Sequence, residues 1–457
     1  MPSRPLEYES LKAVLLRMDA NTRFRISLHM PSIRNVERML PLKIHHLNLN
    51  DSSTKINDTF YAVRIVRHYP DGEAHRRAKA GNSLGWSHSD FDEFGFPFNV
   101  VLPGDITFVD KYWLERRFDS EEDEARHRTG LSVNEKALER LTELKSKGIT
   151  VENYLRSLES LPDNELLQEN IRIREVVKYD SEKMLSRSIE FYQHQLLPFD
   201  CRKNNTKAPY KCFIQLTIRK GRNTQAKLLE YNKKRFEAVK YLHEVLFGSR
   251  TPPIQVEDLD LTSMSSMHGI FRVPDGFRLQ AIKVHLVRDV MIHRNLPLLV
   301  ENSDSLDTVY VNHFLEPHHL QSQAVRNAKR VVIGRSRPSR LGILLQVISL
   351  LPNPEISILP RDMTFTPEHY FQMIRVWSSG ERQVGASLWI KLGDDPTARE
   401  ILRLVQIRSE RTKMTERCVT IHRNDSTKVE AFYVPFKAIK RCEWRCKWIM
   451  KIRVVKA

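Results

Sequence analysis

The sequence predicts an α+β protein with several domains: a small N-terminal helical module, a mixed β and helical middle region, and a repeat-like C-terminal α/β region. Three observations predict this fold class. Apolar residues recur at helical spacing near the N-terminus, alternating strand patterns follow, and one short apolar motif returns through the C-terminal part. The length of 457 residues suits about two to four such domains.

Residues 1–41 are predicted to form short helices, because apolar side chains recur every three or four residues until Pro31 and Pro41 interrupt the pattern. Helices of under ~15 residues are marginal alone in water, so these must pack on the rest of the chain or on a partner. A helical package this small leaves part of its apolar stripe exposed, and such a patch usually marks a partner site. The residues expected to contact a partner are Leu6, Leu11, Val14, Leu15, Met18, Phe24 and Ile26, and those expected to face inward are Ile33, Val36 and Met39.

Residues 42–118 are predicted to be β-rich, because "LKIHHLNLN" and "DTFYAVRIVRHY" both alternate apolar and polar residues. Asn50 and Asp51 supply a turn between them. Residues 119–250 read as largely helical, with one apolar stripe around Leu141 and another from Leu228 to Leu246, followed by a glycine suited to a helix C-cap. The β-like segment "YKCFIQLTIRKG" interrupts this helical region.

Residues 251–457 contain a repeated pattern of the form apolar-x-x-apolar-x-apolar. It appears in "VEDLDL", "LQAIKV", "LDTVYV" and "AKRVVI", and more weakly in "NPEISI" and "GASLWI". The copies lie about 22 to 32 residues apart, near the ~20–29 residue period of leucine-rich repeats, so a leucine-rich-repeat-like region is predicted. We therefore expect Ile282, Val309 and Val331 to be buried at equivalent positions of a parallel sheet. A set of unrelated βα units with similar spacing is the alternative.

One helix between the repeats has both of its ends marked in the sequence. In "FTPEHYFQMIRVWSSGE", Thr366 suits the N-cap, Pro367 the first helical position and Gly380 the position after the end.

The sequence predicts neither a catalytic site nor a metal or cofactor site. It lacks the glycine-rich phosphate loops, the zinc-protease motif and the nucleophile elbow. "SDFDEFG" starts like a calcium loop, but Phe94 stands at a ligand position, so capping carboxylates are the preferred interpretation. Two further groups are interpreted as ordinary connection and strand residues rather than zinc ligands: His313, Glu316, His318 and His319, and the pair Cys442 and Cys446.

Composition and charge narrow the class of protein. Hydrophobic residues make up 41% and charged residues 28%, which is typical of a globular chain, and no apolar run reaches the ~18 residues of a membrane span. The five scattered cysteines and the absence of a signal-peptide pattern favour a cytoplasmic or nuclear location.

The net charge of +17 keeps nucleic-acid binding as an alternative function. The positive charge is spread out, however, and acidic residues alternate with basic ones over much of the chain. The densest basic stretch, "KAIKRCEWRCKWIMKIRVVKA", is interpreted as a half-buried strand with basic residues on its wet face. Nucleic-acid binding is therefore disfavoured.

The opening "PLEYESLKAVLLRMDANTRFRISLHMPSIRNVE" resembles a divergent F-box, and the chain is similar to a large nematode-expanded family with an F-box-like N-terminus followed by a domain of unknown function. "PLKIHHLNLN", "SDFDEFGFPFNVVLPGD" and "LLPFDCRKNNTKAPYKCFIQLTI" match that family, and "TFTPEHYFQMIRVWSSGE" with "VEAFYVPF" resembles an F-box-associated domain. The resemblance implies a substrate-recruiting subunit whose helices bind the Skp-type adaptor of a cullin-type ubiquitin ligase, with an unknown protein target. "MPSIRNVE" departs from the usual F-box ending, so a scaffold that has lost adaptor binding is a further alternative.

Overall fold

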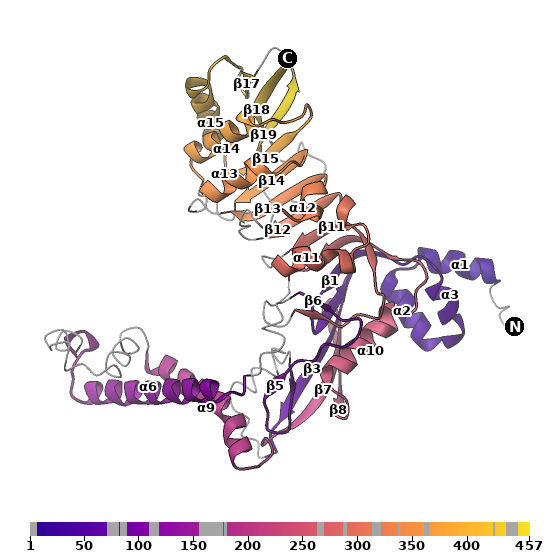
Figure 1. Cartoon of the computed structure of the whole chain (residues 1–457), viewed down its shortest axis with the longest axis vertical. Coiled ribbons are helices and arrows are strands. Elements are labelled where there is room, and N and C mark those ends of the chain that lie inside the picture. Colours follow the sequence, from indigo (N-terminus) through magenta and orange to yellow (C-terminus); the bar gives the residue numbers. More distant parts are fainter. Residues whose placement is uncertain are drawn as a thin grey trace.

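The computed structural model describes residues 7–70, 82, 89–108, 118–154, 177, 181–262, 269–286, 290–312, 321–336, 339, 341–360, 365–423, 426–435 and 447–457. The described chain has a mixed α/β fold built on one 15-stranded sheet that runs along most of the molecule (Figure 1). The strand order is β16-β17-β18-β19-β15-β14-β13-β12-β11-β9-β1-β2-β3-β7-β8. Parallel strands form the centre of this sheet, and antiparallel strands form both ends.

Short helices precede the first strand, as the apolar spacing predicted. They fold beside the sheet at the level of β1, near α10 (Figure 1). Asp19 caps the second helix by accepting a hydrogen bond from the Asn21 backbone N–H, and Pro31 opens a 3₁₀ turn. The elements are α1 (Tyr8–Arg17), α2 (Ala20–His29), η1 (Pro31–Ile33) and α3 (Arg34–Arg38).

At the end of the sheet that carries β8, the strands β1, β2, β3, β7 and β8 pair antiparallel in that order. The helix α10 packs against β3. The strands predicted in "LKIHHLNLN", "DTFYAVRIVRHY" and "YKCFIQLTIRKG" are confirmed. Leu228 and Leu229 belong to β8 rather than to the helix predicted there, because the helix begins only at Arg235. The bounds are β1 (Lys43–Leu49), β2 (Ser53–Ile56), β3 (Thr59–His68), β7 (Lys211–Lys220), β8 (Asn223–Glu230) and α10 (Arg235–Phe247).

A helical hairpin projects from this end of the sheet (Figure 1). It consists of α6 (Glu121–Ser146) and α9 (Glu182–Lys203), each capped by a serine side chain that accepts a backbone N–H. The two helices share a small apolar core around Val133, Ala137 and Leu185. Two short strand pairs lie outside the main sheet. They are β4 (Asp90–Phe91) with β5 (Pro97–Phe98), and β6 (Ile106–Thr107) with β10 (Ile270–Phe271), of which β6 packs next to α11.

The centre of the sheet is a ladder of parallel strands. Its order is β1, β9, β11, β12, β13, β14 and β15, each paired with the next. In Figure 1, α13, α14 and α15 stack along one side of it. The helix α14 begins at Pro367 and ends before Gly380, as the sequence predicted. The strands are β9 (Ile254–Asp260), β11 (Leu279–Leu286), β12 (Thr308–Asn312), β13 (Arg330–Ser336), β14 (Glu355–Pro360) and β15 (Ser387–Leu392). The helical turns between and after them are α11 (Val290–Leu299), η2 (Ser303–Ser305), α12 (Gln323–Asn327), α13 (Leu341–Leu350), α14 (Pro367–Ser379) and α15 (Asp395–Arg408).

Four antiparallel strands complete the other end. The C-terminal basic stretch supplies one of them from Trp448 onward, as predicted, while residues 437–446 of that stretch lie outside the described residues. In that strand Ile452 and Val454 are buried while Arg453 between them is exposed. The strands are β16 (Thr412–Met414), β17 (Cys418–His422), β18 (Thr427–Pro435) and β19 (Trp448–Lys456).

A row of apolar side chains crosses the ladder and forms the centre of the core. Val309 pairs with Val331 in neighbouring strands, and both are fully buried, which confirms part of the prediction. The expected position of Ile282 is wrong, because its side chain is 52% exposed and Val284 pairs with Val309 instead. The complete row is Leu47, Leu259, Val284, Val309, Val331, Ile356 and Leu388.

One continuous sheet crosses the sequence boundaries predicted after residues 118 and 250. The strand β3 pairs with β7 across the first, and β1 pairs with β9 across the second. Residues 50–253 are therefore inserted between two neighbouring strands of the ladder. In the described part of the chain, no helix combines the length and apolar character needed to cross a membrane.

Candidate functional site

The N-terminal helices keep only part of the predicted contact surface available. Leu15 and Phe24 were expected to contact a partner, but both are buried in the protein itself, so this expectation is wrong for them. The Phe24 ring packs edge-to-face on Phe247 of α10, with 6.2 Å between the centroids. Leu11, Met18 and Ile26 are partly buried, Val14 is exposed, and Leu6 lies outside the described residues.

A buried ion cluster ties the helical module to the segment that follows α10. The Glu37 carboxylate accepts hydrogen bonds from Arg23 Nε at 2.9 Å and from Arg250 Nη2 at 2.8 Å. Arg23 also donates to the backbone carbonyls of Glu37, Leu40 and Pro41. Burial lowers the pKa of both arginines, and the Glu37 carboxylate opposes that shift. The module is thus fixed to the segment after α10 by paired charges that are withdrawn from water.

The apolar side chains that remain exposed on the module form a different set from the predicted one. Met39 was expected to face inward, but it is exposed because Leu40 takes the buried position beside it. Ile33 and Val36 are partly buried. The exposed set is Tyr8, Val14, Leu16, Leu28, Met30 and Met39.

An apolar groove of about 490 Å³ begins next to this set. Leu28 of α2 lines it, together with Tyr241 and Leu242 of α10 and Ile214 and Leu229 of the antiparallel strands. Tyr241 and Leu28 are more than half exposed, so the groove extends the exposed apolar surface of the helical module toward β8.

The second candidate surface is the face of the parallel ladder opposite the apolar row. We call this surface the open face, and we define it by side chains that alternate with the buried row along neighbouring strands. Its members are Asp258, His285, Tyr310, Arg330, Glu355, Trp389, Lys451, Arg453, Glu430 and Phe432.

Trp389 lies at the centre of one half of the open face. The Lys451 Nζ lies 4.3 Å from its ring centroid, and the Arg330 guanidinium approaches the same ring at 6.0 Å. The indole N–H donates to Ser387 Oγ at 2.9 Å, which fixes the orientation of the ring. Burial lowers the pKa of Lys451, and Arg453 and Arg330 act in the same direction.

Acidic partners balance the arginines around this tryptophan. The Arg330 Nε lies 2.6 Å from the Glu355 carboxylate, and the Arg453 Nη2 lies 2.7 Å from the Glu430 carboxylate. The surface therefore presents aromatic rings within an alternating pattern of positive and negative charge.

The other half of the open face carries a stacked pair of rings. His285 and Tyr310 lie parallel at 1°, with 4.0 Å between their centroids. The His285 Nε2 is 3.0 Å from an oxygen of Asp258. Burial acts to raise the pKa of that carboxyl, but the interactions with His285, His46 and Lys283 together lower it. Tyr, Trp, Phe and Arg side chains are enriched in protein interfaces, so this composition suits protein recognition.

The metal-like motifs have structural explanations where the structure describes them. Asp90 accepts the Tyr231 hydroxyl and the backbone N–H groups of Arg235 and Phe236, so it caps the start of α10, while Asp92 accepts three backbone N–H groups of its own loop. This confirms capping carboxylates in the loop. His313, Glu316, His318 and His319, and also Cys442 and Cys446, lie outside the described residues. Within the part of the chain that the structure describes, no group of three or more His, Cys, Asp or Glu side chains could hold a metal.

Sequence reasoning did not find the open face. Its residues come from segments far apart in the chain, and each looks like an ordinary strand position. The available signal was the alternation within each strand, such as the polar and aromatic positions of "SLWIKL" between buried leucine and isoleucine.

The sequence model of one protein family, described as a domain of unknown function (DUF3557), matches residues 234–394. The matched segment begins at the start of α10 and extends past β15, so it contains the parallel ladder from β9 onward. No curated protein matches the chain. No solved structure matches it.

Proposed function

We propose that the protein is a non-catalytic protein-interaction protein that recruits a protein target to a cullin-type ubiquitin ligase. In this proposal, the F-box-like helices bind a Skp-type adaptor, and the leucine-rich-repeat-like ladder binds the target through its open face. The observation that carries the proposal is the open face itself, with Trp389 between two cations and a stacked His285–Tyr310 pair on adjacent strands.

The charge pattern of the open face favours a protein target over nucleic acid. A surface for polyanions gathers unpaired lysines and arginines that neutralise phosphates. Here Glu355 and Glu430 pair with the two arginines beside the rings, and Asp258 lies at the other end. Such mixed charges suit the polar rim and aromatic anchors of a protein interface.

The adaptor contact is proposed on the apolar side chains that the helical module leaves exposed. Val14 and Leu16 are exposed on α1, and Leu28, Met30 and Met39 are exposed on the rest of the module. A standard-sized interface requires ~800 Å² from each partner. The adjoining groove at Leu28 adds apolar area to that surface.

Co-purification with the adaptor tests the first half of the proposal. We expect the chain to retain a co-expressed Skp-type adaptor, and Val14→Asp with Leu16→Asp to reduce retention at least ~10-fold, because charges would be buried in the interface. Ile407→Asp is the matched control, because Ile407 is an exposed apolar residue on the distant helix α15. Adaptor binding that is absent from the start, or unaffected by the α1 variant, contradicts this half and supports the scaffold alternative.

A second comparison tests the open face. Proteins captured by the wild type should be lost from Trp389→Ala with Lys451→Ala, while the adaptor is retained. Ile407→Ala should keep both, since it removes an exposed apolar side chain of α15 that belongs to neither proposed surface. If nucleic acid is captured instead, with binding that falls steeply as salt rises, the recruiting function is wrong and the nucleic-acid alternative holds.

A further inference from the structure

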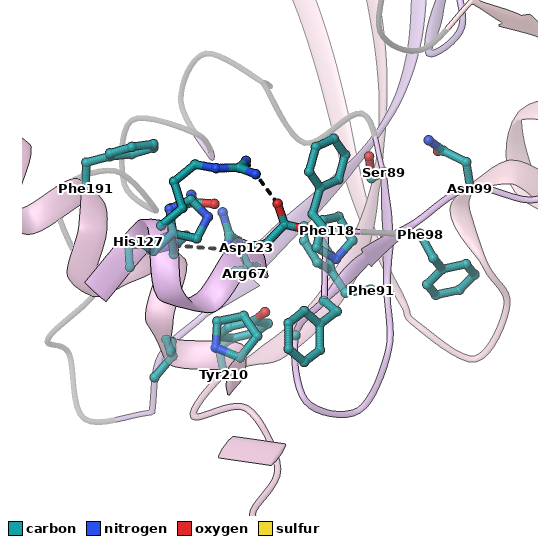
Figure 2. Close-up of a pocket in the computed structure, with 18 residues that line it drawn as sticks. Arg67, Ser89, Phe91, Phe98, Asn99, Phe118, Asp123, His127, Phe191 and Tyr210 are labelled. Carbon is teal, nitrogen blue, oxygen red and sulfur yellow. Dashed lines mark hydrogen bonds and ion pairs between the residues drawn. The ribbon is translucent and has the colours of Figure 1, made fainter. Parts of the chain in front are cut away.

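A pocket of about 610 Å³ lies between the helical hairpin and the strand β3 (Figure 2), and none of its lining residues belongs to the two surfaces described above. Its volume is within the range of ~300–1,000 Å³ that is typical of small-molecule sites. The helices α6 and α9 form one wall, and the loop that carries β4 and β5 forms another. Aromatic rings dominate the lining, and a few polar groups converge among them, which is the usual composition of a ligand site.

The wall formed by the loop is held in place before any ligand arrives. Asp92 accepts three backbone N–H groups of this loop at 2.8 to 3.0 Å. Gly95 has a φ of +100°, and a side chain there would collide with the Tyr210 hydroxyl. Phe96 packs edge-to-face on Phe199 of α9, with the centroids 4.8 Å apart. The pocket is therefore a preformed feature of the fold.

Arg67 at the end of β3 is the principal polar group of the pocket. Its guanidinium lies 5.1 Å from the Phe91 ring and 5.4 Å from the Tyr210 ring. It donates to His194 Nε2 at 3.1 Å, which requires that nitrogen to be unprotonated. Figure 2 places Arg67 between His127 and Phe91, with Tyr210 beside it. Among the described residues, no carboxylate forms an ion pair with Arg67, so its charge is not neutralised there.

The other arginine of the pocket is already paired. Arg126 donates to Asp123 Oδ1 at 3.1 Å, and the second oxygen of Asp123 accepts the Ser120 hydroxyl at 2.8 Å. Burial lowers the pKa of His127, so this ring adds a neutral surface to the aromatic wall. The described lining therefore offers one guanidinium that is free of carboxylate partners, inside an aromatic enclosure.

We propose that this pocket binds a small molecule with a planar aromatic body and a single anionic group, and that Arg67 binds the anion. A carboxylate would form a charge-assisted hydrogen bond with the guanidinium, while the aromatic body would contact Phe91, Phe98 and Phe191. A cationic ligand would meet an uncompensated positive charge, and a neutral one would leave the guanidinium without an anion. This inference is independent of the ligase proposal.

Two probes that differ only in the anionic group test the inference. The first is 2-naphthoate, and the second is 2-naphthamide, which keeps the ring system without the charge. Titration calorimetry on the full chain should show the naphthoate binding at least ~10-fold more tightly than the amide. Arg67→Met should remove this preference, and Arg67→Lys should restore part of it, because lysine keeps the charge but not the planar fork.

Arg64→Met supplies the matched control. It is the same substitution on the same strand, but the Arg64 guanidinium lies over Phe60 at 5.9 Å and does not line the pocket. The Arg64→Met protein should prefer the naphthoate over the amide as strongly as the wild type does. Tyr241→Asp tests the other cavity, since it places a charge in the apolar groove near α10.

Three results would overturn the inference. One is a preference that survives Arg67→Met in protein whose circular dichroism matches the wild type. Another is loss of naphthoate binding in Tyr241→Asp alone. The third is failure of the naphthoate to saturate the wild type below about 1 mM.

Discussion

Two asparagines, the partly buried Asn302 and the buried Asn353, join successive units of the parallel ladder. Asn302 accepts the backbone N–H of Ala281 at 2.9 Å and donates to the carbonyl of the same residue at 2.7 Å. Asn353 donates to the carbonyls of Val325, Arg326 and Ala328. Ala281 lies in β11 before the pairing with β12 begins at Lys283, and the carbonyls bound by Asn353 belong to α12 and the residue after it. In both places an asparagine side chain satisfies backbone groups that no strand pairs on that side.

Asn353→Ala should therefore lower the unfolding free energy by more than the loss of a small side chain would suggest. The variant leaves buried carbonyl groups without a donor, which costs about 1–3 kcal/mol of unfolding free energy. Asn327→Ala is the control, because Asn327 is exposed at the end of α12. Urea denaturation compares the two variants. Equal midpoints would show that the contacts of Asn353 contribute little.

His243 gives the stability a pH dependence that can be measured. Its ring is buried, its Nδ1 donates to the Arg272 carbonyl at 2.7 Å, and its Nε2 lies 2.6 Å from the Thr54 hydroxyl. Burial lowers the pKa of His243 to about 4. The unfolded state, with a pKa near ~6.5, binds a proton first as pH falls, so stability is lost below that value.

The expected loss from this single histidine is about 2 kcal/mol between pH 7.5 and pH 5. His243→Gln can keep a donor and an acceptor without titrating. Its unfolding free energy should therefore fall less over this range than that of the wild type, as measured by urea denaturation at both pH values. If the unfolding free energies of the two proteins fall equally between pH 7.5 and pH 5, the pKa of His243 is not lowered in the folded state.

At the scale of the element, the sequence predicted strands and helices better than it predicted register. The ends of α14 follow from Thr366, Pro367 and Gly380, since capping is a local property. The register of β11 does not follow from local pattern. "LQAIKV" and "AIKVHL" both fit the repeated motif, and Leu279 and Ala281 are both buried. Only pairing with β9 and β12 selects Val284 as the core position.

The same substitution at two isoleucines tests this register. Ile356→Ala removes a fully buried side chain from the apolar row and should cost about 2–5 kcal/mol. Ile282→Ala removes a side chain that is 52% exposed and should cost less than about 1 kcal/mol. Chemical denaturation gives both values. Similar costs would place Ile282 in the core, in conflict with the observed pairing.

At the scale of the whole molecule, the candidate surfaces could not be predicted from the sequence. Segments far apart in the chain decide which side chains of the helical module are buried and which residues meet on the open face. Leu15 and Phe24 fit an exposed helix stripe until residues near Phe247 and Arg250 are placed against the module. The open face likewise requires eight strands from separate segments of the chain, β9, β11 to β15, β18 and β19, to be brought into register. Local spacing contains no information on either assembly.

The distribution of core residues also predicts how stability varies across the molecule. The ladder shares the large apolar core, whereas the hairpin α6/α9 has a small core of its own, and every residue of β8 is exposed. Native-state hydrogen exchange should therefore be at least ~100-fold slower in β12 to β15 than in β8 and α6. Uniform protection would mean that the chain unfolds as a single unit.

During synthesis on the ribosome, β1 is made long before β9, the strand that pairs with its other edge. About 200 residues separate β1 from β9, and at ~5–20 residues per second they take roughly 10–40 s to synthesise. During that time β1 has only β2 on one edge, and Phe24 and Glu37 lack the Phe247 and Arg250 side chains that cover them. The nascent chain therefore presents apolar strand and helix surface that the finished protein hides, and such surface is prone to aggregation until β9 and α10 are made.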